Sequence, residues 1–209
     1  MTAQAKPPVR VGLYGGAFDP PHLAHQALVR AAIEQLPLGR LLIMPTGHAW
    51  HKQRPLTAAV HRLAMARLAF AQLQGAFVDD RETRRSGPSY TIDTLAELQA
   101  EWPGHVWCLL IGEDQLEAFC QWHRWRDILQ LAQLVVARRG DGAAPLQLPW
   151  QGTQAGHAPP ERPIELRMPR MPHSSTAIRA ALARAEPAQA LVGDDVARYI
   201  AQHHLYQTD

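Results

Sequence analysis

The sequence predicts an α/β protein: a Rossmann-like parallel sheet with helices on both faces, followed by a small helical C-terminal portion. The main observation is alternation, because short apolar runs and stretches of helical spacing follow one another along the 209 residues. Such alternation is typical of parallel strands joined by crossover helices. The chain is long enough for one sizeable core, and its 46% hydrophobic and 19% charged residues are ordinary for a globular domain.

Strands are expected where a short apolar run stands between polar stretches, at 9–14, 41–44, 76–78, 106–111, 134–137 and 164–168. Helices are expected at 26–36, 57–72, 90–100, 113–131 (one helix or two), 174–185 and 194–203. We find no internal repeat and expect a single domain over 1–209. Its expected subdivisions are a tail at 1–8, a long Gly/Pro-containing loop at 140–163 and the helical C-terminal portion at 174–209.

The composition of the chain indicates which binding partners and which cellular compartment are expected. The net charge of +2 is too small to indicate a nucleic-acid surface. No stretch approaches the roughly 20 apolar residues of a membrane span, and the first residues lack the apolar core of a secretory signal. Cys108 and Cys120 are the only cysteines, and Cys108 lies in an apolar run where a buried thiol is expected. We therefore expect a cytoplasmic protein without disulfides, nucleic-acid partners or membrane partners, and homo-oligomers stay open.

The most informative segment is GGAFDPPHLAH at residues 15–25, between the first predicted strand and the first predicted helix. Its Gly-Gly turn lets the backbone approach a ligand, and the helix start supplies N–H groups with a partial positive charge. His22 and His25 share one face of that helix. These features together predict an anion site with two imidazole donors, suited to phosphate chemistry. The histidine pair alone more often marks surface residues or a chance metal pair.

A second anion site is predicted by HSSTAIR at residues 173–179. Ser174 is a good N-cap candidate, so Ser175 and Thr176 fall in the first turn of the helix. Arg179 lies one turn after Ser175 on the same side. Hydroxyls, N–H groups and a guanidinium can then converge on a polyphosphate. Plain helix capping with a surface arginine is the alternative.

These two segments resemble, in the same order, the GGxFDPxHxGH and SSTxIR signatures of the nucleotidyltransferase superfamily. The chain departs at Ala24, where the family usually has Gly, and the extra methyl group would crowd a nucleotide lying against the backbone. Four further features narrow the resemblance to the bacterial nicotinate-nucleotide adenylyltransferase family, over most of the chain: GPSYTIDTL at 87–95, IGED at 111–114, Trp122 and VVARRG at 135–140. AWHK at 49–52 stands where the family often has PPHK, so only Lys52 is carried over.

The resemblance implies catalytic roles for His22 and His25. It implies an ATP site formed by Gly15, Gly16, Phe18, Asp114, Ser175, Thr176 and Arg179. It implies a mononucleotide site formed by Lys52, Ser89, Tyr90, Thr91, Trp122 and Arg139. Mg²⁺ is expected to arrive with ATP, held mostly by water and phosphate oxygens, without protein ligands.

The residues expected to bind the acceptor mononucleotide, here called the acceptor side, have physical roles that can be stated, and several of them also have a structural explanation. The helix start at 89–91 would aim backbone N–H groups at a pyridine carboxylate, which favours the acid over the amide. Trp122 would stack on the pyridine ring, and a core position explains it equally well. Asp114 would accept from ribose or adenine groups, cap a helix, or both. Arg138 and Arg139 would meet the mononucleotide phosphate or remain a solvated basic pair.

The expected reaction transfers the adenylyl group of ATP to nicotinate mononucleotide and releases pyrophosphate. Its geometric requirement is that the helix starts near His22 and Ser174 clamp one triphosphate. The alternatives are nicotinamide mononucleotide or another phosphate acceptor, an aminoacyl-tRNA synthetase relative, and a non-catalytic nucleotide sensor. A dehydrogenase is disfavoured because no G-x-G-x-x-G follows the first strand. A zinc site joining His48 and His51 to the first pair lacks a usual ligand pattern.

Overall fold

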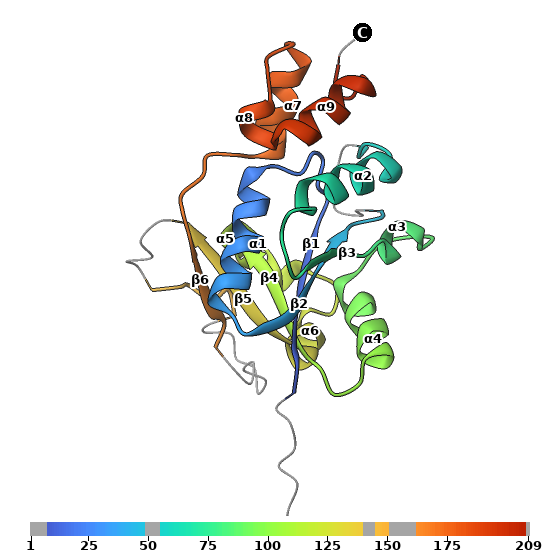
Figure 1. Ribbon diagram of the computed structural model, residues 1–209. Coiled ribbons are helices and arrows are strands. Elements are labelled where there is room, and N and C mark those ends of the chain that lie inside the picture. The colour runs from blue at the N-terminus through green and yellow to red at the C-terminus, as the bar shows by residue number, and fades with distance from the viewer. Residues whose placement is uncertain (1–7, 49–54, 140–144, 151–161, 208–209) are drawn as a thin grey trace, which may run out of the picture.

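A six-stranded sheet forms the centre of the molecule, in the order β3-β2-β1-β4-β5-β6 with every neighbouring pair parallel (Figure 1). The computed structural model describes residues 8–48, 55–139, 145–150 and 162–207. The strands are β1 (Arg10–Gly16), β2 (Leu38–Pro45), β3 (Ala76–Val78), β4 (Val106–Gly112), β5 (Ala132–Arg139) and β6 (Ile164–Met168). The strand order reverses between β1 and β4, which is where ligands bind in open sheets of this kind. The predicted Rossmann-like fold is therefore confirmed.

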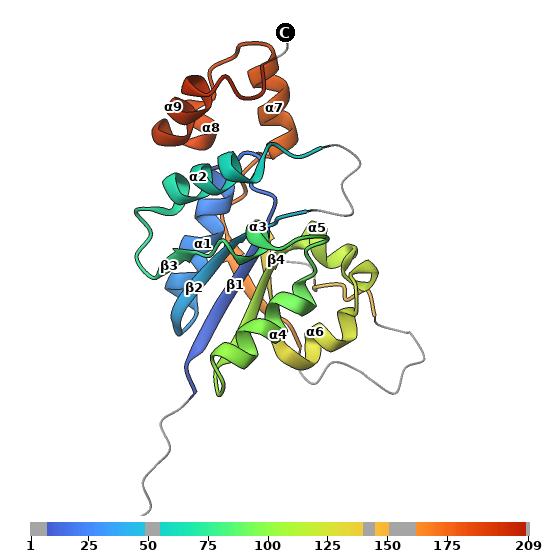
Figure 2. The same cartoon turned by 90° about the vertical axis from the view of Figure 1, so that its right-hand side faces the viewer.

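Helices cover both faces of the sheet, with α1 and α2 on one side and α4 and α6 on the other (Figure 2). The helices of the described residues are α1 (Leu23–Gln35), α2 (Ala59–Phe70), α3 (Arg81–Arg84), α4 (Thr91–Glu101), α5 (Glu113–Glu117), the 3₁₀ turn η1 (Phe119–Gln121), α6 (Trp125–Leu131), α7 (Ser175–Ala183), α8 (Gln189–Val192) and α9 (Asp194–Gln202). In both views α7, α8 and α9 gather beyond the carboxyl edge of the strands. This group is the predicted helical C-terminal portion.

Strand β4 shows why the apolar runs of the sequence are continuous. Cys108 and Leu110 point into the core cluster under α1 and α2, whereas Trp107, Leu109 and Ile111 point into the cluster under α4 and α6. Successive side chains of a strand face opposite sides, so a strand covered on both faces needs apolar residues at every position.

Element boundaries differ from the expectations at several places, as at β2, which begins at Leu38 and not at residue 41, and three further differences concern helices. The helix expected from residue 26 begins at Leu23, which puts both motif histidines at its start. The region 113–131 contains α5, η1 and α6, interrupted at Arg124, whose φ of 53° is left-handed. The helices α3 and α8 were not expected, because four residues are too few to show a helical period.

Two simpler expectations concern thiols and membranes. Cys108 is a buried free thiol, as expected, and Cys120 is a partly buried one. Among the described residues, no helix is long and apolar enough to cross a lipid bilayer.

Candidate active site

The phosphate loop, defined as residues 15–22, comprises the last two residues of β1 and the segment that leads to α1, and it lies at the carboxyl edge of the sheet. Phe18 adopts a left-handed backbone with φ of 48°, unusual for a bulky residue. Its ring is 2% exposed and packs edge-on against Tyr14, Phe70 and His25, with centroid distances of 5.6, 5.6 and 5.1 Å. The Phe18 side chain therefore packs into the core beneath the loop, and its assignment to the ATP site stays a prediction.

The two motif histidines form a stacked pair at the start of α1. The ring of His22 lies 3.6 Å from that of His25, centroid to centroid, with 18° between the planes. The Nδ1 atom of His25 accepts a hydrogen bond of 3.1 Å from the backbone N–H of His22. Burial, and secondly the charge of His22, hold the pKa of His25 well below its usual 6.5. His25 is therefore neutral at neutral pH, and its Nε2 carries the proton as a donor.

The second anion site begins where the sequence predicts it, with Ser174 at the N-cap of α7. The Ser174 Oγ accepts a hydrogen bond of 3.2 Å from the backbone N–H of Ala177. The Ser175 hydroxyl bonds outside its own helix and donates to the carbonyl of Pro20 at 3.0 Å. A hydroxyl of the second site therefore binds the backbone of the phosphate loop.

Arg179 makes the second connection between the two sites. Its Nη1 donates to the carbonyl of Asp19 at 2.6 Å, and its Nη2 donates to the Thr176 hydroxyl at 3.1 Å. The ring of His173, just before α7, stacks 6.3 Å from that of His22. The starts of α1 and α7 are therefore neighbours, joined by two hydrogen bonds and one ring contact, and a triphosphate held by both stays a prediction.

Asp19 anchors the phosphate loop to two other parts of the chain. Its carboxylate is 1% exposed and accepts from the Tyr206 hydroxyl at 2.8 Å and from the backbone N–H of Thr57 at 3.4 Å. Burial raises the pKa of Tyr206, and the Asp19 charge raises it further. The Tyr206 contact was missed from the sequence, where nothing marks this residue of a polar tail.

The segment 46–48 after β2 joins the phosphate loop to the acceptor side. The backbone N–H of Thr46 donates to the carbonyl of Gly16 at 2.9 Å, and that of Ser89 donates to the carbonyl of His48 at 3.1 Å. The Ser89 N–H therefore already donates to a main-chain carbonyl, and its binding of a ligand carboxylate stays a prediction that would require the loss of this hydrogen bond. The Ser89 hydroxyl is buried and has no hydrogen-bond partner among the described residues.

Tyr90 follows Ser89 directly, and a ring contact links Tyr90 to the segment that contains Trp122. Tyr90 is the N-cap of α4, and its ring lies 4.4 Å from that of His123, next in sequence to Trp122. Trp122 is half-buried, with its ring 5.2 Å from that of Phe119. Trp122 thus combines a core contact with a partly exposed surface, and its stacking on a pyridine ring stays a prediction.

The remaining predicted residues fall at the edge of this site or outside the described residues. Asp114 is exposed in the first turn of α5, whose N-cap is Gly112, so the capping alternative is wrong. Arg138 bridges Glu113 at 3.0 Å and Glu165 at 2.9 Å, so it is not the solvated residue of a basic pair. Lys52 and the side chain of Arg139 lie outside the described residues.

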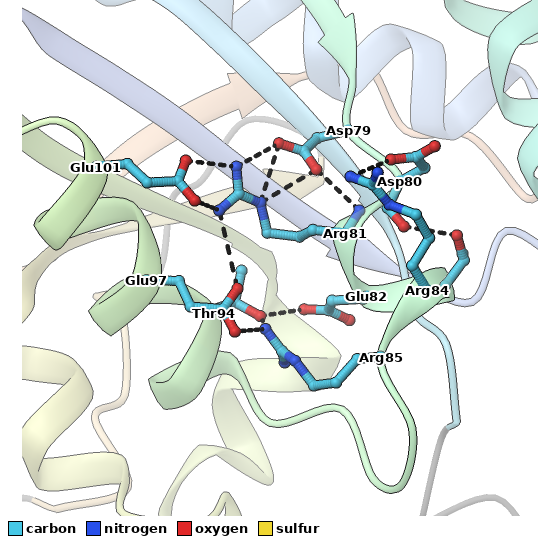
Figure 3. Close-up of polar contacts among 10 residues, drawn as sticks. Asp79, Asp80, Arg81, Glu82, Arg84, Arg85, Thr94, Glu97 and Glu101 are labelled. Carbon is cyan, nitrogen blue, oxygen red and sulfur yellow. Dashed lines mark hydrogen bonds and ion pairs between the residues drawn. The ribbon is translucent and has the colours of Figure 1, made fainter.

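A group of charged side chains and one threonine, the α3–α4 cluster, joins the segment around α3 to α4 (Figure 3). Its residues are Asp79, Asp80, Arg81, Glu82, Arg84, Arg85, Thr94, Glu97 and Glu101. Arg81 bridges Asp79 and Glu101 at 2.9 Å each. Thr94 donates to buried Glu82 at 2.8 Å, and burial raises the pKa of Glu82 to about 7. The cluster fastens α3 to α4, whose first turn carries the acceptor-side residues.

Gly47 completes the acceptor-side packing. A Cβ at this position would lie 2.0 Å from the carbonyl oxygen of Glu82, so only glycine fits. No group of three or more His, Cys, Asp or Glu suited to a metal occurs in the described part of the chain. His51, one of the four histidines of the alternative zinc site considered from the sequence, lies outside the described residues.

The parallel sheet, and the two helix starts that meet beyond its switch point, define a protein of the nucleotide-binding α/β class. A family model described as cytidylyltransferase-like matches residues 13–181. A protein of Albidiferax ferrireducens named "probable nicotinate-nucleotide adenylyltransferase" is 50% identical over 200 residues, covering 95% of this chain and 98% of its own. A protein of the same name from Methylibium petroleiphilum is 44% identical over 211 residues, with 97% and 94% covered.

Solved structures agree on the fold. A Plasmodium falciparum nicotinic acid mononucleotide adenylyltransferase complexed with NaAD matches with a TM-score of 0.73 and 18% identity, over 95% of this chain and 97% of that one. A structure described as a nicotinate-nucleotide adenylyltransferase of Vibrio parahaemolyticus matches with a TM-score of 0.66. The chain belongs to the cytidylyltransferase-like family and, within it, to the nicotinate-nucleotide adenylyltransferases.

Proposed function

We propose that this enzyme transfers the adenylyl group of ATP to nicotinate mononucleotide, giving nicotinate adenine dinucleotide and pyrophosphate. The observation that carries the proposal is the meeting of the two helix starts, joined by Ser175 to Pro20 and by Arg179 to Asp19. Two sets of N–H groups with partial positive charge then face one space, which suits a polyphosphate. The acceptor-side residues share the same edge of the sheet, so donor and acceptor can meet there.

The chemistry needs positioning more than proton transfer. A phosphate oxygen of the mononucleotide attacks the α-phosphorus of ATP in line, and the bond to the β-phosphate bridging oxygen breaks. The attacking phosphate is already ionised at neutral pH, so no general base is required. His22 would contact the α-phosphate and the bridging oxygen, and the Nε2–H of neutral His25 would hold the chain beside it. Preorganised donors of this kind stabilise charge that develops in the transition state.

The leaving pyrophosphate is assigned to the second helix start. Ser175, Thr176 and Arg179 would hold the β- and γ-phosphates, and Arg179 would exchange its present partners for phosphate oxygens. Gly15 and Gly16 would let the nucleotide lie against the backbone, and a Cβ on Gly15 would meet nothing within 4 Å. Mg²⁺ would enter as part of the ATP substrate, held by phosphate oxygens and water.

The acceptor pocket is assigned to the start of α4 and the neighbouring aromatic residue. Thr91, Tyr90 and the buried Ser89 hydroxyl would bind the pyridine carboxylate, and Trp122 would stack on the ring. A carboxamide would bring its own N–H donors towards these donors, which costs about 1–3 kcal/mol for each unsatisfied group. Lys52 and Arg139 would meet the mononucleotide phosphate, and Asp114 the adenosine. A cytoplasmic location is part of the proposal, since both cysteines are free thiols.

An acceptor panel tests this function. Purified protein is given MgATP with nicotinate mononucleotide, nicotinamide mononucleotide, phosphopantetheine or no acceptor, and pyrophosphate and products are measured. We expect the dinucleotide with nicotinate mononucleotide at a specificity constant at least about tenfold above the amide's, in line with one mismatched buried group. Equal use of the amide would support the nicotinamide alternative. ATP binding without turnover on any acceptor would support a nucleotide sensor.

A further inference from the structure

Arg62 is a buried arginine beneath the loops of the active site. It is the fourth residue of α2 and is 1% exposed. Buried arginines are rare, because removing a guanidinium from water is costly unless its N–H groups are all engaged. Neither the motifs nor the assigned site residues include Arg62.

The guanidinium donates four hydrogen bonds, and each acceptor is a main-chain oxygen. Nη1 donates to the carbonyls of Ala17 at 2.9 Å and Thr46 at 2.6 Å. Nη2 donates to the carbonyl of Gly47 at 3.0 Å, and Nε to that of Thr57 at 2.8 Å. One planar group therefore holds three separate segments of the chain.

Each of these three segments belongs to one side of the candidate site or is hydrogen-bonded to it. Ala17 belongs to the phosphate loop, and Thr57 donates its backbone N–H to the Asp19 carboxylate of that loop. Gly47 precedes His48, whose carbonyl receives the backbone N–H of Ser89 on the acceptor side. The Arg62 guanidinium therefore connects the ATP side to the acceptor side, in addition to the direct hydrogen bond from the Thr46 N–H to the Gly16 carbonyl.

We propose that Arg62 is a positioning residue that sets the spacing between the phosphate loop and the acceptor-side segment 46–48. This inference rests on the proposed adenylyl transfer, because the spacing aligns the mononucleotide phosphate with the α-phosphorus of ATP. A guanidinium is a rigid planar fork, so its four bonds fix the carbonyl positions relative to one another. A misplacement of about 1 Å between reacting groups can cost about 100-fold in rate.

Stability alone does not explain this residue well. Burial lowers the pKa of Arg62, and the Asp19 charge only partly opposes that effect. An apolar side chain of similar volume would avoid burying a charge, but it would leave the carbonyls that Arg62 now binds without donors. What only a guanidinium supplies here is the fixed relative position of four carbonyls.

The test compares Arg62→Lys with the matched control Arg67→Lys. Lysine keeps the charge and part of the donor set but not the fork. Arg67 lies on the same helix with a side chain 58% exposed, paired with Asp80 at 3.5 Å. For Arg62→Lys we expect kcat to fall about 100-fold while the dissociation constants of a non-hydrolysable ATP analogue and of the mononucleotide stay within about threefold. Arg67→Lys should match the wild type.

The outcomes separate the inference from the proposed function. A folded Arg62→Lys with wild-type kcat overturns the positioning role, as does a variant that loses substrate affinity and kcat in parallel. Failure of both Arg62→Lys and Arg62→Met to fold would show a purely structural role and would also overturn it. If the wild type itself makes no product, the proposed function fails, and backbone hydrogen exchange decides the spacing claim. Faster exchange at both 16–19 and 46–48 in Arg62→Lys supports it, and unchanged exchange contradicts it.

Discussion

The buried carboxyl of Glu82 gives this fold a stability that depends on pH, and Glu82→Gln tests it. Glu82 belongs to the α3–α4 cluster, is 6% exposed, and accepts a hydrogen bond of 2.8 Å from Thr94 (Figure 3). Burial raises its pKa from 4.5 to about 7, against the lowering effects of the Thr94 hydrogen bond and the Arg85 charge. Glutamine keeps the oxygen that accepts from Thr94 and never ionises.

The direction in which folding stability changes with pH follows from the raised pKa of Glu82. Between pH 4.5 and about 7 the folded protein holds a proton on Glu82 that the unfolded chain releases. The stabilising effect of this group is therefore complete below pH 4.5 and is lost as the pH rises through about 7. A shift from 4.5 to about 7 corresponds to about 3 kcal/mol. Glu82→Gln should therefore match the wild type near pH 4.5 and exceed it above pH 7.

Thermal unfolding of both proteins across this pH range measures the effect. For a chain of this size we expect Glu82→Gln to raise Tm by roughly 6 to 12 °C at about pH 8.5 and by little at about pH 5. The control is Glu117→Gln, an exposed carboxylate on α5, which should change neither value much. A Tm difference that is the same at both pH values would refute the argument, because it would show that Glu82 does not change its ionisation in this range.

Two further predictions concern the acceptor pocket. Trp122→Ala should weaken nicotinate mononucleotide binding about tenfold or more and ATP binding little, because a lost aromatic stack costs about 1–3 kcal/mol. Titration calorimetry measures both affinities, with Trp102→Ala at the opposite edge of the sheet as the control. Equal losses of affinity for the two substrates would assign Trp122 to the fold. Ser89→Ala should leave Tm unchanged or raised, since its buried hydroxyl has no partner among the described residues, yet should raise the KM for the mononucleotide with the KM for ATP unchanged. An unaltered acceptor KM would remove that hydroxyl from the pocket.

The sheet could be predicted from the sequence because its signal is local. Apolar runs of strand length are covered on both faces, as β4 shows with Cys108 on one side and Trp107 on the other. The helices α3 and α8 could not be predicted because four residues are too few to show a helical period. The start of α1 at Leu23 could not be predicted because His22 is not a usual N-cap residue.

The two phosphate segments were also predictable, since each is a short string whose residue types suit one kind of ligand. What the sequence could not show is how they are held together. Asp19 meets Tyr206, and Arg62 meets three segments, through contacts between residues far apart in the chain. A lone arginine on a helix gives no local sign of such partners. The use of the Ser89 N–H by His48 is a long-range contact of the same kind.

The turnover number of His22→Ala is the sharpest test of the proposed phosphate site. We propose that the histidine pair at the start of α1 and the helix start at Ser174 hold one triphosphate between them. Pyrophosphate release from ATP and nicotinate mononucleotide is measured for folded His22→Ala, with His105→Ala at the amino edge of the sheet as control. We expect a loss of about 100-fold or more for His22→Ala, as for one preorganised donor, and none for the control. Turnover close to that of the wild type in folded His22→Ala would contradict the proposal.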